Sequence, residues 1–179
     1  MSFQVSIVTP EQQVLDARYL DAPDLRLLRM GITFRHRTGE GGAEGRWTLK
    51  LPSPSEDIAL DCLELEVDGP ADQMPDHLAS AVRGALRGAG LSEVAHLQTH
   101  RTVVPLRDQA DRPLGALSDD VVSAFDGDEV GWRFREIEVE AAEGAPPTVI
   151  ESVVDVLRAA GAGEPDNVPK LARALGPRA

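Results

Sequence analysis

The sequence predicts an α+β domain built on a large antiparallel sheet or barrel, and two observations lead to this fold class. Many short segments rich in β-branched and apolar residues are separated by glycine, proline and aspartate, which are typical of turns. Segments with the apolar spacing of helices lie among these strands and after them. The length of 179 residues allows one substantial hydrophobic core, so a single domain over residues 1–179 is expected.

The first part of the chain predicts strands and one short helix. Segments 4–8 and 14–20 are interpreted as strands. A short helix follows at the Asp24 position, with Leu25, Leu28 and Met30 expected on its buried side. Segments 32–37 and 46–51 form a predicted hairpin, because the loop between them contains four glycines.

The rest of the chain continues the same alternation. Asp76 is expected to cap one helix, and Val149, Val153, Val156 and Leu157 are expected to face inward on another. The predicted strands are 58–67, 91–106, 114–125 and 131–141, and the predicted helices are 76–88, 146–160 and 168–175.

The overall charge limits the function classes. Lys and Arg total 18 against 30 for Asp and Glu, giving a formal net charge of -12. This balance argues against a nucleic-acid binder, which normally has a basic surface. It remains compatible with a small anionic ligand held by a local group of cations, and with an acidic surface that serves solubility alone.

The chain has features of a cytoplasmic protein. Cys62 is the only cysteine, which excludes an intrachain disulfide, and it is expected to be a small core residue. No signal-peptide pattern opens the chain, and no run reaches the roughly 18 apolar residues of a membrane helix. We therefore expect no membrane association.

Basic residues recur at strand spacing between Tyr19 and Lys50. Arg35 and Arg37 share a strand face because side chains alternate with a period of two, and Lys50 lies on the paired strand. Repeated arginine on a face that would otherwise be apolar indicates an anionic ligand.

Acidic residues show the same alternation. Glu136, Glu138 and Glu140 share one strand face, and Glu64 and Glu66 share another. On ordinary half-exposed strands such glutamates face water, and this interpretation stays open. Inside a barrel, they could instead hold a hard divalent cation such as Mg²⁺ next to a polyanion.

The histidines and the glycine-rich loop are weaker candidates for a metal or phosphate site. His96 and His100 are four residues apart on a predicted strand, where this spacing does not build the metal pair of a helix, so hydrogen-bonding roles are favoured. His36 is expected to point away from Arg35 and Arg37. The glycine-rich loop at 39–45 lacks the lysine of a Walker motif and is interpreted as a turn.

Several motifs in order, spanning about Val5 to Leu175, resemble the CYTH domain of the triphosphate tunnel metalloenzyme superfamily. The chain is most similar to the bacterial branch in which this domain precedes a helical CHAD domain. The matching motifs are Leu15–Asp21, Asp24–Leu28, Gly31–Arg37, Trp47–Pro52, Leu117–Asp120, Arg135–Glu140 and Lys170–Leu175.

The resemblance implies an antiparallel β-barrel, or tunnel, of about seven to eight strands with flanking helices, which binds triphosphates with Mg²⁺ or Mn²⁺. Members include inorganic triphosphatases, thiamine triphosphatases and some adenylate cyclases. By position, it implies Arg35, Arg37, Lys50, Arg101 and Lys170 as phosphate-binding residues. It implies Glu136, Glu138, Glu140, Asp119 or Asp120, and Glu64 as metal ligands, and Glu136, Glu138 and Lys50 as catalytic residues.

One family motif is absent. The family's first strand carries Glu-x-Glu-x-Lys, whereas this chain opens with Met1–Ile7, a segment that resembles the second strand. Either the sequence begins one strand late, through truncation or a misplaced start, or the protein has lost that strand. Without the two glutamates we expect weak or absent hydrolysis, and the alternatives are a non-catalytic polyphosphate- or nucleotide-binding module or an acidic interaction domain. A barrel that lacks this strand would have an open edge, which favours a homodimer.

Overall fold

A computed structural model describes residues 6–7, 9–40, 42–52, 62–146, 148–166 and 168–179. The chain divides into two compact units. The first unit comprises Met1–Gln13, His100–Val122 and Arg135–Asp166, and the second comprises Val14–Thr99, Ser123–Phe134 and Asn167–Ala179. None of the helices in the described ranges combines the length and the apolar run that a membrane span requires.

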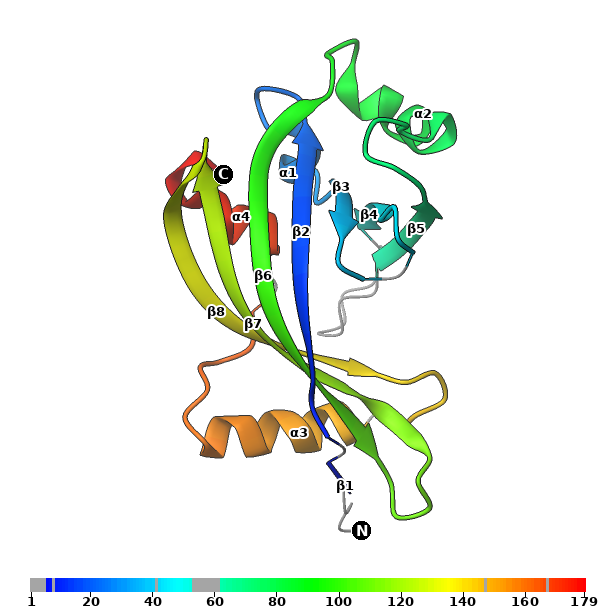
Figure 1. Ribbon diagram of the computed structural model, residues 1–179, viewed down its shortest axis with the longest axis vertical. Coiled ribbons are helices and arrows are strands. Elements are labelled where there is room, and N and C mark those ends of the chain that lie inside the picture. Colours follow the sequence, from blue (N-terminus) through cyan, green and yellow to red (C-terminus); the bar gives the residue numbers. More distant parts are fainter. Residues whose placement is uncertain (1–5, 8, 41, 53–61, 147, 167) are drawn as a thin grey trace. The chain divides into compact units, whose positions relative to one another are not determined.

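The strands form an antiparallel sheet, which confirms the predicted α+β class (Figure 1). Their order is β5-β4-β3-β2-β6-β7-β8, and β1 pairs with β6. The strands are β1 (Ser6–Ile7), β2 (Glu11–Asp21), β3 (Thr33–Thr38), β4 (Arg46–Pro52), β5 (Cys62–Asp68), β6 (Ser92–Arg107), β7 (Pro113–Asp126) and β8 (Glu129–Ala141). The helices are α1 (Arg26–Arg29), α2 (Asp76–Leu86), α3 (Thr148–Ala159) and α4 (Lys170–Leu175), followed by a 3-10 turn at Gly176–Arg178.

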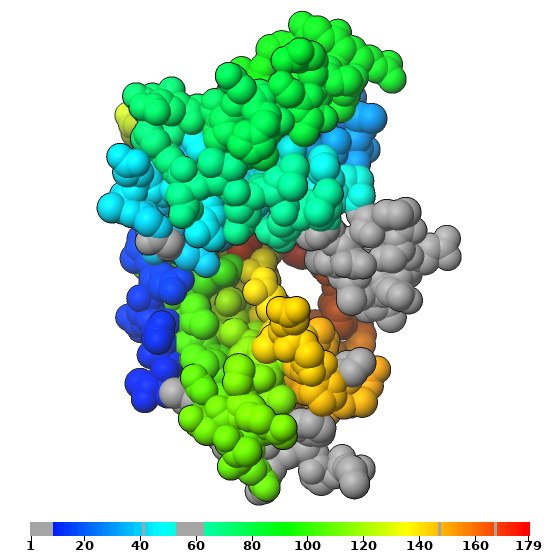
Figure 2. All heavy atoms as spheres, turned by 90° about the vertical axis from the view of Figure 1, so that its right-hand side faces the viewer, coloured from blue at the N-terminus to red at the C-terminus, as the bar shows by residue number. Residues whose placement is uncertain are grey.

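In the second unit, α2 packs on the apolar face of β3 and β4. Leu78, Val82 and Leu86 recur at helical spacing and are buried, as the sequence predicts. They join a core cluster with residues of α1, β3 and β4. Figure 2 shows the outer surface of this unit, where the green atoms of α2 adjoin the cyan atoms of β4. The cluster comprises Ala22, Leu27, Ile32, Phe34, Trp47, Leu49, Leu78, Val82 and Leu86.

Asp21 organises the turn between β2 and α1. Its side chain is 1% exposed, and its carboxylate accepts the backbone N–H of Ala22 at 2.6 Å, of Leu27 at 3.0 Å and of Leu28 at 3.0 Å. The first amides of a helix have no intrahelical acceptor, so this carboxylate satisfies donors that burial would otherwise leave unpaired.

Some details of the helices differ from the sequence predictions. Met30 is 50% exposed rather than buried, because α1 ends at Arg29 and Leu27 takes the inward position. Asp76 is the first helical residue and makes no side-chain cap, since the N-cap is Pro75. Val156 is 68% exposed, because only one end of α3 packs inward. The expected burial of Cys62, and strand residues 4–5, 8 and 58–61, lie outside what the structure describes.

The first unit contains α3 and the parts of β6 and β7 that adjoin the turn between them. Leu106 and Leu114 from the two strands pack against Val149 of α3, and Val153 joins them. Gly115 allows close approach of β7 and β8, because a Cβ at this position would lie 2.1 Å from the Glu140 carbonyl oxygen.

Candidate functional site

The second unit presents a charged sheet face opposite the face that α2 covers. Residues paired across an antiparallel ladder point to the same side, so the register defines each face. One row runs Tyr19, Arg35, Thr48 and Glu66, and neighbouring rows join Arg37 to Arg46 and Lys50 to Glu64. We call this the charged face: Arg35, Arg37, Arg46, Thr48, Lys50, Glu64, Glu66 and Asp68.

On this face the cations of β4 are paired with carboxylates of β5. Lys50 Nζ lies 2.6 Å from Glu64 Oε1. Arg46 donates to Asp68 at 2.7 Å and to Glu66 at 3.0 Å. The hydrogen bond to Asp68 and the charge of Glu66 raise the pKa of the Arg46 guanidinium. Glu64 and Glu66 therefore share a face as predicted, and that face meets basic side chains.

The two arginines of β3 lie on the same face and are partly buried. Arg35 Nη1 donates to the hydroxyl of Tyr19 at 3.3 Å, and Tyr19 itself is 3% exposed. Arg37 forms an ion pair with Glu40, and its side chain is only 14% exposed. Partial burial and the contacts with Tyr19 and Glu40 limit the conformational freedom of the two arginine side chains. This lowers the entropy cost of ordering them around a ligand.

His36 points to the opposite face, as predicted. It is buried, its Nε2 lies 2.9 Å from the Gly69 carbonyl oxygen, and its ring lies 5.0 Å from that of Trp47. His96 has the predicted hydrogen-bonding role, with Nε2 2.7 Å from Asp16 Oδ2 and its ring stacked on Phe125.

The first unit contains an acidic cluster formed by Asp120, Glu136 and Glu138. One carboxylate oxygen from each residue lies within 4.8 Å of the other two. Asp120 comes from β7 and the two glutamates come from β8, where their spacing of two residues places them on one face.

Arg101 of β6 binds this acidic cluster directly. Its Nε and Nη2 donate to the two oxygens of Asp120, each at 2.7 Å, and Nη2 also donates to Glu138 at 2.6 Å. Asp120 is fully buried and Arg101 is 10% exposed. The two parallel hydrogen bonds are the bidentate geometry that arginine and carboxylate favour.

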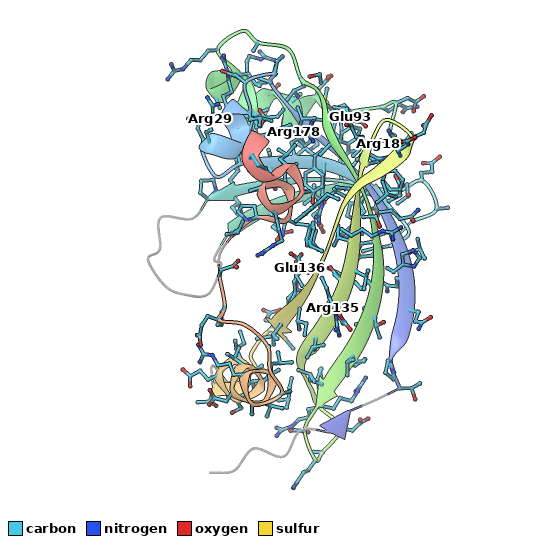
Figure 3. All side chains as sticks on the ribbon, turned by 90° about the vertical axis from the view of Figure 1, so that its left-hand side faces the viewer. Arg18, Arg29, Glu93, Arg135, Glu136 and Arg178 are labelled. Carbon is cyan, nitrogen blue, oxygen red and sulfur yellow. The ribbon has the colours of Figure 1, made fainter. Side chains whose placement is uncertain are left out.

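The remaining acidic candidates on β7 and β8 lie apart from the acidic cluster. Asp119 accepts two hydrogen bonds from Arg135, at 2.7 and 2.9 Å, and this bond raises the pKa of the guanidinium. Side chains of adjacent residues in a strand point to opposite faces. The Asp119–Arg135 pair therefore lies on the other face of the strands from Asp120 and Glu136 (Arg135 and Glu136 are labelled in Figure 3). Glu140 shares the alternation of Glu138 but is exposed.

The acidic cluster fits a hard divalent cation. Its donors are carboxylate oxygens, which Mg²⁺ and Mn²⁺ prefer, and they are close enough for one ion to touch all three. A cation would also reduce the repulsion among these carboxylates.

Sequence reasoning identified several of these residues and missed others. Lys170 is the half-buried first residue of α4. Arg46 and Tyr19 were missed, although Arg46, Thr48 and Lys50 show the same period-two spacing as Arg35 and Arg37.

Comparisons with known proteins identify relatives over most of the chain. The family model of the CYTH domain matches residues 4–172. Two curated proteins of Mycobacterium tuberculosis, from strains CDC 1551 and H37Rv and both uncharacterised, are 32% identical over 94% of this chain. The match covers 34% of each, so the chain spans about a third of the length of these relatives.

Solved structures share the fold. A Bacillus halodurans protein provisionally named an adenylate cyclase superposes with a TM-score of 0.63 at 18% identity, covering 90% of this chain and 82% of its own. The PH1819 protein of Pyrococcus horikoshii gives 0.52 at 18% identity, covering 97% and 86%. HpAC1 of Hippeastrum, provisionally named an adenylyl cyclase and described as having a dominant triphosphatase activity, gives 0.52 at 16% identity, covering 90% and 81%.

Proposed function

Because the chain belongs to the CYTH domain family, we propose that it binds inorganic or organic triphosphates through its arginine and lysine side chains. The observation that carries the proposal is the charged face, where Arg35, Arg37 and Lys50 lie on adjacent, paired strands. Guanidinium groups bind phosphate oxygens through paired hydrogen bonds, and an ammonium adds a compact point charge. Arg101 and Lys170 are proposed as further phosphate-binding residues.

We propose that Asp120, Glu136 and Glu138 hold Mg²⁺ or Mn²⁺. The bound ion would neutralise phosphate charge and polarise a phosphoryl group. Asp119 and Glu140 are less suitable as ligands, because Asp119 is paired with Arg135 and Glu140 is exposed. Glu64 is paired with Lys50, which favours a role on the charged face over metal coordination.

Hydrolysis of phosphoanhydride bonds is the activity that this set of groups supports. Positioning by fixed cations and electrostatic stabilisation of the phosphoryl group require no covalent nucleophile. Glu136, Glu138 and Lys50 are the proposed catalytic residues. Binding and hydrolysis of triphosphate are therefore measured separately.

Isothermal titration calorimetry with inorganic triphosphate tests the proposal. Arg37→Ala and Lys50→Ala should each weaken binding by about tenfold or more, because hydrogen bonds to charged groups are worth about 1.5–3 kcal/mol. Arg18→Ala is the control, since Arg18 pairs with Glu93 away from the charged face (Figure 3). An unchanged affinity in both test variants would contradict the assignment.

Phosphate release in the presence of Mg²⁺ or Mn²⁺ separates the enzyme from the binding module. Turnover of about 1–10³ s⁻¹, the usual range for enzymes, would establish a triphosphatase and refute the expectation of weak hydrolysis. Saturable binding with no phosphate release would establish a non-catalytic triphosphate-binding module.

A further inference from the structure

The cations of β4 on the charged face are each paired with carboxylates of β5. Lys50 pairs with Glu64, and Arg46 pairs with Glu66 and Asp68. The carboxylates follow the alternation of β5, directly opposite the residues of β4 in the register. The sheet therefore carries its own anions next to the cations that a phosphate would need.

We propose that Glu64 determines the specificity of the charged face by competing with phosphate for Lys50. Without ligand, Glu64 holds the ammonium; when a phosphate group binds Lys50, the Glu64 carboxylate has to move away or remain beside a second anion. The inference rests on the proposed triphosphate binding and adds that Glu64 selects which form of the ligand binds.

The exposure of the pair makes this exchange feasible. The side chains of Lys50 and Glu64 are each 36% exposed, so a ligand can reach the ammonium without unfolding the sheet. The 2.6 Å separation means that one of the three ammonium donors is directed at Glu64. Glu66 differs, because it accepts from Arg46 and lies 3.5 Å from the Thr48 hydroxyl.

Charge then decides between forms of the ligand. A metal-free triphosphate brings several negative charges next to Glu64, and like charges at short range repel. A triphosphate complexed with Mg²⁺ carries less negative charge, and its ion attracts the carboxylate. Glu64 therefore disfavours the free anion and favours the metal-complexed form.

The test measures the affinity of the 179-residue chain for inorganic triphosphate by calorimetry, once in EDTA and once with excess Mg²⁺. In EDTA, Glu64→Gln should bind about fivefold more tightly than wild type, which is the strength of a partly exposed ion pair. The gain should be smaller in Mg²⁺. Glu64→Asp retains the charge and should remain close to wild type.

A matched control separates this effect from a general change of charge. Glu93→Gln removes one carboxylate that is 41% exposed and pairs with Arg18 at 3.0 Å, and it should leave the affinity unchanged. In a Lys50→Met background, Glu64→Gln should give a smaller gain, because the competition for Lys50 is gone and only the direct repulsion between Glu64 and the phosphates remains. A gain in affinity cannot arise from damage to the fold.

The possible results are distinct. If wild type binds and Glu64→Gln binds equally or more weakly in EDTA, the inference is wrong while the proposed function stands. An equal gain in EDTA and Mg²⁺ would also overturn the selection for the metal-complexed form. If neither wild type nor Glu64→Gln binds triphosphate under either condition, the proposed function fails and the inference fails with it.

Discussion

Arg101→Gln removes the guanidinium that neutralises the buried carboxylate of Asp120. Both Asp120 oxygens accept from Arg101 at 2.7 Å, and Asp120 is fully buried. Removing one partner of a buried ion pair weakens the compensation of the charge that remains, and breaking such a pair typically costs 3–5 kcal/mol. Glu138 is 38% exposed and can regain water, so the low end applies, about 3 kcal/mol.

Urea unfolding followed by circular dichroism measures this loss. In a thermal unfolding experiment on a protein of this length, a loss of about 3 kcal/mol corresponds to a fall in the melting temperature of about 6 to 12 °C. Replacing both partners should recover part of the loss, because Asp120→Asn removes the buried carboxylate charge that Arg101→Gln would leave behind.

Arg135→Gln is the matched control for this prediction. Arg135 also binds a carboxylate with two hydrogen bonds, that of Asp119, but its side chain is 65% exposed. Water replaces the lost partner there, so stability should stay close to that of wild type. If Arg101→Gln is no more destabilising than Arg135→Gln, the assignment of Arg101 as the essential counter-ion is wrong.

Three further variants test separate parts of the structure. Asp120→Asn should weaken Mn²⁺ binding in calorimetry while Asp119→Asn leaves it unchanged, and equal effects would contradict the choice of ligand. Asp21→Ala should lower the free energy of unfolding by about 2 kcal/mol, because buried amides lose their acceptor. Hydrogen bonds from the backbone N–H and then the guanidinium of Arg112 hold the pKa of Asp108 below its ordinary 3.8. The ionised carboxylate therefore stabilises the fold above pH 3.8, and this contribution is lost as the pH falls through the folded-state pKa. Asp108→Asn should therefore lower the urea midpoint at neutral pH and have little effect in acid below the folded-state pKa; an equal effect at both would refute this explanation.

The sequence predicted the faces of the strands but not their partners. Alternation in 33–38 indicates that Arg35 and Arg37 share a side opposite Phe34 and His36, and the structure confirms this. The ion pair of Lys50 with Glu64 depends on the register between β4 and β5, which local patterns do not define.

The sequence likewise does not define the partners of the acidic residues on β7. Asp119 and Asp120 are adjacent and chemically identical, so sequence alone left both open as ligands. Only the packing of β7 against its neighbours buries Asp120 completely and directs Asp119 to Arg135. Burial of a charged group depends on long-range contacts, and so does the pairing of Arg101 with that carboxylate.

The most direct test of the central proposal compares inorganic triphosphate with inorganic phosphate as ligands of the wild-type chain in Mg²⁺, by calorimetry at constant ionic strength. Cations on adjacent strands can contact several phosphoryl groups of one ligand, so we predict saturable binding of triphosphate with a Kd below about 1 mM and at least tenfold tighter than phosphate. Equal affinity for the two anions, or no saturable binding of triphosphate, would contradict the proposal that the charged face recognises a triphosphate chain.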